Sequence, residues 1–144
     1  MASDLRVVID TNVVVSAVLL PRSTPRQAFD RAIEKSQLLL SNPILAELSD
    51  VLARPKFDRY IPARLRAEFL AALIDKAELV TITAVVTDCR DPKDNKYLEL
   101  AVSGRASHIL TGDADLLALH PYAGVSIIQP QAFLQELPEP DPEA

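Results

Sequence analysis

Four acidic residues of this chain, Asp10, Glu47, Asp94 and Asp113, stand beside or within its apolar segments. Carboxylates that gather repel each other, since two unit charges ~4 Å apart cost about 4 kcal/mol at an effective dielectric of 20. A divalent cation removes that cost, and oxygen ligands are the preference of Mg²⁺ and Mn²⁺. Such a site lowers the pKa of bound water and stabilises charge on a phosphate. The predicted chemistry is therefore metal-dependent phosphoryl chemistry.

Each of the four acidic residues has a predicted position that suits a metal site, and three of them also have an ordinary structural explanation. Asp10 directly follows an apolar run. Glu47 lies at the border of a predicted helix face, where a solvated glutamate is the alternative. Asp94 is predicted in the middle of its helix's apolar face, although a first-turn aspartate favoured by the helix dipole is the alternative. Asp113 comes two residues after the segment "ILT" and could be only the N-cap of the next helix.

Other polar residues near these positions have supporting roles in the metal-site hypothesis. Asn12 and Thr11 follow the first aspartate and are expected to orient a ligand or the substrate. Ser16 lies one helical turn beyond Asn12 and could join them, or could serve only in helix packing. Asp91 and Asp115 could assist the metal site. Alternatively, Asp91, which precedes a proline, could be only the N-cap of the next helix, and Asp115 could be only an acidic residue in the first turn of a helix.

The period of the apolar residues switches repeatedly between strand and helix. Two helices are expected to begin at an N-cap followed by proline, with Thr24 and Asn42 as the caps. Strands that alternate with helices indicate an α/β fold with a mostly parallel sheet and helices on both faces. Strands are expected at residues 5–9, 37–41, 78–83, 108–111 and 125–129. Helices are expected at 25–35, 62–76 and 116–119, after the Asn42 cap with Ile44, Leu48, Val51 and Leu52 facing inward, before Gly104, and near Phe133.

The predicted fold brings the acidic residues to one place. Functional sites in open parallel sheets lie beyond the carboxyl ends of the strands. Asp10 and Asp113 both follow strands and are expected at the same edge, where Glu47 and Asp94 would join them. Each residue has an ordinary explanation singly, so it is their convergence that supports the hypothesis.

Composition sets limits on the class of protein. The chain has 144 residues, of which 49% are hydrophobic and 24% charged, as in a soluble single domain. Its net charge of −5 argues against a broad basic surface for nucleic acids. It does not exclude a nuclease, because bound cations reverse the charge of a carboxylate cluster locally. Cys89 is the single cysteine and there are two histidines, which argues against a thiolate or imidazole metal cage.

Compartment and domain limits also follow from the sequence. The first residues lack the pattern of a secretory signal, and the apolar run Val13–Leu20 is far shorter than a bilayer span. We therefore expect a cytoplasmic protein without a membrane segment. Residues 1–137 are expected to form the domain, and the acidic, proline-rich residues 138–144 a disordered tail.

Four segments of the chain resemble the PIN-domain family of metal-dependent ribonucleases, in particular its branch of toxins from toxin–antitoxin systems. The segments are "VVIDTNVVVSAVLL", "SNPILAELSDVLARPKF", "CRDPKDNKYLELAVSGRASHILTGDADLLAL" and "VSIIQPQAFL". They span nearly the whole chain from Arg6 to Leu134. Their occurrence together in this order makes a specific combination.

The resemblance implies both a site and a fold. The acidic quartet of the family falls on Asp10, Glu47, Asp94 and Asp113, with Asn12 supporting the first aspartate and with Asp91 and Asp115 as accessory acids. The implied fold is a three-layer α/β/α arrangement around a five-stranded parallel sheet of order 3-2-1-4-5. Dependence on Mg²⁺ or Mn²⁺, single-stranded RNA as substrate, homodimers and a small antitoxin partner are implied as well.

Binding of RNA requires basic groups that flank the acidic pocket. Several arginines and lysines follow the predicted first helix or lie in the middle of the chain, and ordinary surface charge is the alternative for each. The residues considered are Arg22, Arg26, Arg54, Lys56 and Lys96, together with Arg59, Arg64 and Arg66.

The leading hypothesis is an endoribonuclease in which Asp10, Asp94 and Asp113 hold one or two metal ions and Glu47 is a ligand or the base for the attacking water. A haloacid-dehalogenase-like phosphatase is one alternative, but it needs a second acid at the position of Asn12. The other alternative is a non-catalytic regulator that binds metal, RNA or a partner protein. RNA cleavage separates it from the nuclease.

Overall fold

The computed structural model describes residues 5–138. The predicted disordered tail, residues 138–144, lies outside the described residues apart from Pro138.

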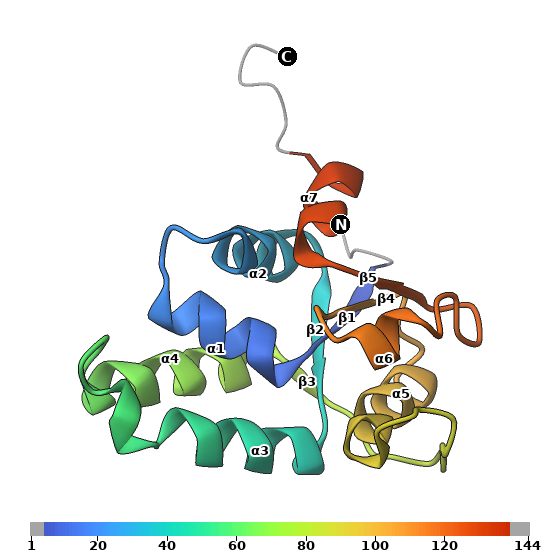
Figure 1. Cartoon of the computed structure of the whole chain (residues 1–144), viewed down its shortest axis with the longest axis horizontal. Helices are drawn as coiled ribbons and strands as arrows, with labels where there is room; N and C mark the ends of the chain where they lie inside the picture. Colours follow the sequence, from blue (N-terminus) through green and yellow to red (C-terminus); the bar gives the residue numbers. More distant parts are fainter. Residues whose placement is uncertain (1–4, 139–144) are drawn as a thin grey trace.

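A five-stranded sheet forms the centre of the molecule (Figure 1). The strand order is β3-β2-β1-β4-β5 and every neighbouring pair is parallel. Both the predicted fold class and the order 3-2-1-4-5 are confirmed. The strands are β1 Arg6–Ile9, β2 Gln37–Leu40, β3 Glu78–Leu79, β4 His108–Leu110 and β5 Ser126–Ile128.

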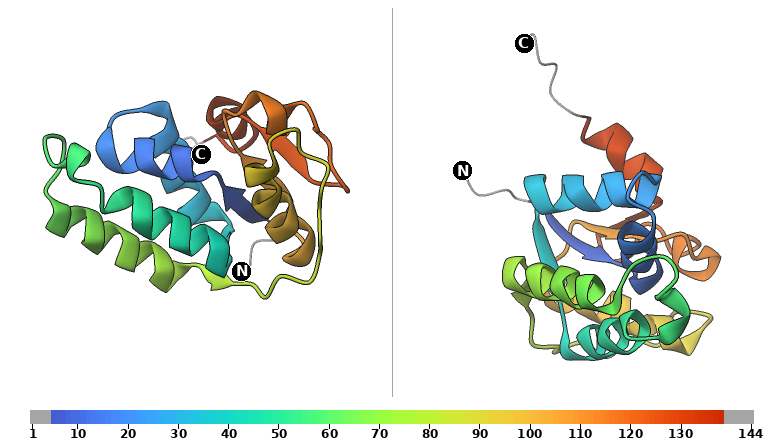
Figure 2. Two further views of the ribbon diagram at one scale, coloured as in Figure 1. Left: turned by 60° about the horizontal axis from the view of Figure 1, so that its bottom comes forward. Right: turned by 90° about the vertical axis from the view of Figure 1, so that its left-hand side faces the viewer.

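Helices cover both faces of this sheet and make three layers. Figure 2 shows α2 and α7 on one side of the sheet and α3, α4 and α5 on the other. None of the helices in the described part of the chain is both long and apolar enough to cross a bilayer. The α-helices are α1 Thr11–Leu19, α2 Thr24–Lys35, α3 Asn42–Leu52, α4 Ala63–Lys76, α5 Asn95–Ser103, α6 Ala114–Leu117 and α7 Pro130–Glu136, and the 3₁₀ helices are η1 Pro55–Phe57 and η2 Pro92–Asp94.

The core lies where the central strands contact these helices. Val7 and Val8 of β1 and Ile109 of β4 are fully buried. A strand covered on both faces needs apolar side chains in both directions, which explains the continuous run at 5–9. The run ends where the chain leaves the sheet at Asp10, the N-cap of α1.

Two predicted helix caps are displaced by one residue. Ser23, not Thr24, caps α2, and its hydroxyl accepts a hydrogen bond from the Arg26 amide at 3.3 Å. Ser41, not Asn42, is the N-cap of α3 because β2 ends at Leu40 and one extended residue joins it to the helix. The prolines therefore occupy the second helical position, where a missing N–H is tolerated.

The predicted strand at 78–83 is much shorter in the structure. Only Glu78–Leu79 pairs as β3, followed by one hydrogen bond from Val80 N to Leu40 O. β2 ends at Leu40 and the chain enters α3 after Ser41, so no strand residues remain for a longer β3 to pair with. The amides of Thr83 and Ala84 donate instead to the Ser103 hydroxyl.

Candidate active site

Asp10 and Asp113 are connected through one threonine at the carboxyl ends of β1 and β4. Pairing of Ile9 with Leu110 places Asp10 beside Thr111. The Thr111 hydroxyl donates to Asp10 Oδ2 at 2.7 Å and accepts from the Asp113 amide at 3.0 Å. Asp10 is 5% exposed and Thr111 is fully buried, so this contact is shielded from water.

The second oxygen of Asp10 is also bound. Asp10 Oδ1 accepts from the backbone amide of Asn12 at 3.1 Å, which caps the first turn of α1. The support that Asn12 gives to the first aspartate therefore comes from its backbone, while its side chain is exposed. Both carboxylate oxygens are held in place, and each keeps lone pairs for a further ligand.

A cavity of about 450 Å³ opens between these groups. Asp10 and Asp113 line it, and so do the predicted accessory residues Asn12 and Ser16. The cavity thus collects polar groups from the end of β1, from α1 and from the start of α6, as a site beyond the carboxyl ends of the strands requires.

Asp94 lies near the same charges but is placed differently from the prediction. It ends η2 and is the N-cap of α5 rather than a residue within an α-helix, because its backbone amide closes a tight turn with Asp91 O at 3.0 Å. Its carboxylate makes no capping bond and stays available. Burial, then the charges of Asp113 and Asp10, raise the pKa of Asp94 to about 6.

The two accessory acids also cap or begin helices. Asp91 accepts from the Lys93 amide at 3.1 Å as the N-cap of η2. Asp113 likewise caps α6 by accepting from the Leu116 amide at 3.0 Å, and Asp115 is in its first turn. The capping roles and the acidic site are therefore compatible, since a capping oxygen leaves the other oxygen available.

Glu47 is held in a network with Tyr97 and Lys96. The Tyr97 hydroxyl donates to Glu47 Oε1 at 2.5 Å and accepts from the Thr11 amide at 3.2 Å. Lys96 Nζ lies 2.8 Å from Glu47 Oε2. Burial alone would raise the pKa of Glu47, but these hydrogen bonds outweigh burial and lower the pKa. The carboxylate is therefore ionised at neutral pH.

Sequence reasoning missed two residues of this site, Thr111 and Tyr97. Burial and the negative charge of Asp10 raise the pKa of Tyr97, so its hydroxyl remains a donor to Glu47. A signal for both existed: Thr111 directly follows a strand, and Tyr97 comes three residues after Asp94 on a helix. Neither residue type is acidic, and a buried threonine or tyrosine is ordinary in a core.

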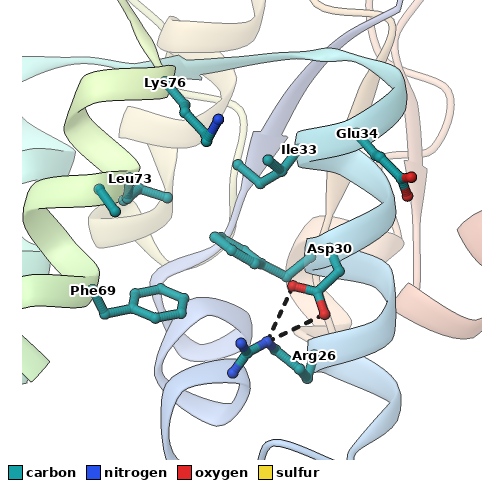
Figure 3. Close-up of a pocket in the computed structure, with 9 residues that line it drawn as sticks. Arg26, Asp30, Ile33, Glu34, Phe69, Leu73 and Lys76 are labelled. Atoms are coloured by element: carbon teal, nitrogen blue, oxygen red, sulfur yellow. Dashed lines mark hydrogen bonds and ion pairs between the residues drawn. The ribbon is translucent and has the colours of Figure 1, made fainter. Parts of the chain in front are cut away.

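The basic residues predicted to contact RNA are spread over different surfaces. Of these, Lys96 reaches the acidic site through Glu47. Arg26 pairs with Asp30 at 3.1 Å in the groove between α2 and α4 (Figure 3). Arg54 pairs with Asp50 and Lys56 lies over the Phe57 ring, and both basic residues follow the C-terminal end of α3. Arg22 is exposed and precedes α2.

Arg66 is excluded as an RNA contact. Its side chain is 1% exposed. The guanidinium donates to Leu52 O at 2.7 Å and to Ile61 O at 2.5 Å, and it pairs with Asp58 at 2.9 Å. Arg66 therefore fastens the turn after α3 to α4, because a buried guanidinium needs partners for its donors.

The donor chemistry of the site fits Mg²⁺ or Mn²⁺. Within residues 5–138 no three acidic, histidine or cysteine side chains are gathered as ligands of one ion. Mg²⁺ commonly takes only one or two carboxylates and keeps several waters, and Asp10 and Asp113, which line one cavity, provide two. Burial, and after it the negative charges of Asp113 and Asp10, raise the pKa of Asp94, and a bound cation would offset the part that comes from those charges.

Three solved structures have a similar fold. A chain of VapBC2 from Rickettsia felis, in a complex with promoter DNA, is 11% identical, with a TM-score of 0.57 over 85% of this chain and 97% of that one. PAE2754 from Pyrobaculum aerophilum is 14% identical, with a TM-score of 0.57 over 91% and 88%. FitAcB from Neisseria gonorrhoeae is 18% identical, with a TM-score of 0.55 over 87% and 98%.

Comparison of sequences identifies the family. The uncharacterized protein MJ1680 of Methanocaldococcus jannaschii is 30% identical and the alignment covers 92% of this chain and 91% of that protein. The family model of the PIN domain matches residues 6–115, a range that includes Asp10, Glu47, Asp94 and Asp113. The chain therefore belongs to the PIN domain family.

Proposed function

We propose that this protein is a Mg²⁺- or Mn²⁺-dependent endoribonuclease that hydrolyses phosphodiester bonds of single-stranded RNA. The proposal rests on membership of the PIN domain family and on the acidic site. One observation carries it: Thr111 holds Asp10 beside Asp113 in an open cavity, and both raise the pKa of Asp94. These three carboxylates are on separate segments of the chain and share one electrostatic environment.

The residues divide the work in this proposal. Asp10 and Asp113, which line the cavity, and Asp94 would hold the cation, in part through waters that the cation keeps. When bound, the cation supplies a water of lowered pKa and stabilises charge on the scissile phosphate. Thr111 and the Asn12 amide orient Asp10, and Tyr97 and Lys96 orient Glu47. Glu47 is ionised, as required of either a ligand or a base for the attacking water.

The same contacts favour the nuclease over the phosphatase. A phosphatase of the haloacid dehalogenase type uses the aspartate after the first strand as a nucleophile. Here both oxygens of Asp10 already accept hydrogen bonds, which suits an oriented ligand. The residue two positions later is Asn12, which cannot act as the second acid.

Cleavage of RNA tests the proposal directly. Purified protein is incubated with unstructured RNA and Mn²⁺, beside Asp10→Asn and beside a sample with EDTA. We expect the wild type alone to cut, leaving a 5′-phosphate and a 3′-hydroxyl. Turnover of p-nitrophenyl phosphate without RNA cleavage would indicate the phosphatase, and metal binding without either reaction would indicate the regulator.

The biological role in this proposal is that of the toxin of a toxin–antitoxin system, acting in the cytoplasm as a homodimer and inhibited by a small antitoxin. Support comes from the resemblance to the toxin branch, and the fold is shared with chains from VapBC2 and FitAcB. Induced expression is expected to arrest growth for the wild type and not for Asp10→Asn. A short reading frame that overlaps the start of the gene and rescues growth would identify the antitoxin. Equal growth of both strains would contradict the role.

A further inference from the structure

A second polar cavity adjoins the acidic site. Its volume is about 260 Å³, and it lies between the start of α3 and the extended chain that follows β3. Lys96 lines it, and the ammonium of the same residue pairs with Glu47 at 2.8 Å. Lys96 therefore separates this cavity, which we call the α3 cavity, from the carboxylates.

Ser41 leaves an unused polar group at the α3 cavity. The residue is fully buried, and its hydroxyl has no hydrogen-bond partner among residues 5–138. Ser41 is the N-cap of α3, yet its side chain makes no capping bond to the first turn. Buried hydroxyls and helix N-termini normally have partners, so a bound polar group would satisfy groups that the chain leaves open.

The other walls of the α3 cavity combine apolar side chains with a hydrogen-bond donor and a hydrogen-bond acceptor. Val80 and Ile82 are partly buried and provide the apolar part. Glu99 accepts from the Val86 amide through Oε2 at 3.0 Å, which leaves Oε1 for a ligand. The backbone amide of Asn42 in the first turn of α3 supplies a donor.

These features fit a nucleobase better than a phosphate. An anion would face Glu99 and lie near Glu47, while Lys96 is already paired with Glu47. A planar heterocycle needs apolar walls for its faces and polar groups for its edge. The volume is below the roughly 300–1,000 Å³ of pockets for drug-sized ligands, as suits a single base.

We propose that the α3 cavity binds the base of a nucleotide next to the scissile phosphate and that it selects guanine. This proposal rests on the proposed ribonuclease function. Proteins recognise single-stranded RNA by binding unstacked bases and forming hydrogen bonds with the Watson–Crick edges of those bases. Guanine presents two adjacent donors that match the Glu99 carboxylate and one carbonyl that matches the backbone amide of Asn42 at the start of α3. The cavity would thereby set where the RNA is cut.

Binding of short labelled RNAs tests the α3 cavity separately from cleavage. The protein is Asp10→Asn, and the probes are oligouridylates with one central guanosine or one central adenosine, followed by fluorescence anisotropy. We expect about tenfold tighter binding of the guanosine probe, equivalent to about 1.4 kcal/mol. The preference should disappear on adding Thr81→Tyr, which places a ring on a residue that lines the cavity, or Glu99→Gln.

Thr87→Tyr is the matched control, because Thr87 is an exposed residue of the same segment and does not line the α3 cavity. It should keep the preference. Equal binding of the two probes, or a preference that survives both cavity variants, would overturn the proposal. Wild-type RNA cleavage without base preference would also contradict it while leaving the nuclease intact. A guanosine preference in a protein that never cleaves RNA would support the cavity and contradict the nuclease.

Discussion

The hydroxyl of Thr111 donates to Asp10 Oδ2 at 2.7 Å and joins the ends of β4 and β1. The same oxygen accepts from the Asp113 amide at 3.0 Å. One buried side chain therefore sets the position of two carboxylates that are 103 residues apart in the sequence. Asp10 cannot turn away from the cavity without breaking this bond.

Replacement of Thr111 by valine should impair the site with little change of shape. Valine cannot donate to Asp10 or accept from Asp113, and loss of such orienting contacts typically lowers metal affinity or activity by about 10–100-fold. Thr111→Ser keeps the hydroxyl and should retain most activity. Mn²⁺ titrations of RNA cleavage measure the effect, and equal affinities for Thr111→Val and the wild type would show that Asp10 is oriented by other contacts.

Asp94 predicts a pH dependence of stability in the metal-free protein. Its carboxyl pKa is about 6 in the folded protein against an ordinary value of 3.8. The folded state therefore binds this proton more tightly, so raising the pH through this window lowers the free energy of unfolding. Asp94→Asn should melt at a higher temperature than the wild type in EDTA near neutral pH. The difference should shrink towards about pH 4, and a difference independent of pH would contradict the assignment.

Divalent cations should stabilise the wild type. A ligand that binds only the folded state adds about 2.7 kcal/mol at a hundredfold excess over its Kd. The melting temperature should rise with Mn²⁺ for the wild type and not for Asp10→Asn. The rise should weaken below about pH 6, where Asp94 becomes protonated. An equal rise in both proteins would place the bound cation elsewhere.

Tyr97 should act on catalysis through Glu47. Its hydroxyl lowers the pKa of that carboxyl, so Tyr97→Phe is expected to raise the Glu47 pKa and shift the acid limb of the pH–rate profile upward. We expect kcat to fall by about 10-fold, with KM nearly unchanged. Tyr60→Phe, an exposed tyrosine, is the control. A loss of activity without a shifted profile would assign Tyr97 to packing alone.

Gly104 should be intolerant of a side chain. A Cβ there would lie 2.9 Å from Leu39 Cδ1 and 3.1 Å from Leu100 O. Gly104→Ala should therefore destabilise the protein by about 1–3 kcal/mol, as overpacking does. Gly112→Ala is the matched control, since its Cβ would meet no atom within 4 Å. Urea denaturation measures both, and equal stabilities of the two variants would contradict the close contact at Gly104.

Periodicity predicted most of the elements but not their ends. The apolar runs at 5–9 and 108–111 became β1 and β4 because buried parallel strands need apolar side chains on both faces. The strand predicted at 78–83 is longer than the observed β3, Glu78–Leu79. The length of β3 depends on where its partner β2 ends, and β2 is remote in the sequence. Asp94 was placed inside a helix because a 3₁₀ turn and the start of an α-helix have similar short-range patterns.

The sequence by itself determined the α/β class, and residue type and position after strands indicated Asp10 and Asp113 as candidates for the site. The residue type alone shows that a side chain is a carboxylate, and the nearby sequence shows whether it follows a strand. The tertiary structure alone decided which neutral groups orient them, namely Thr111 for Asp10 and Tyr97 for Glu47. It also decided that Arg66 is buried while Lys96 joins the site. These contacts link distant segments, so no local pattern contains them.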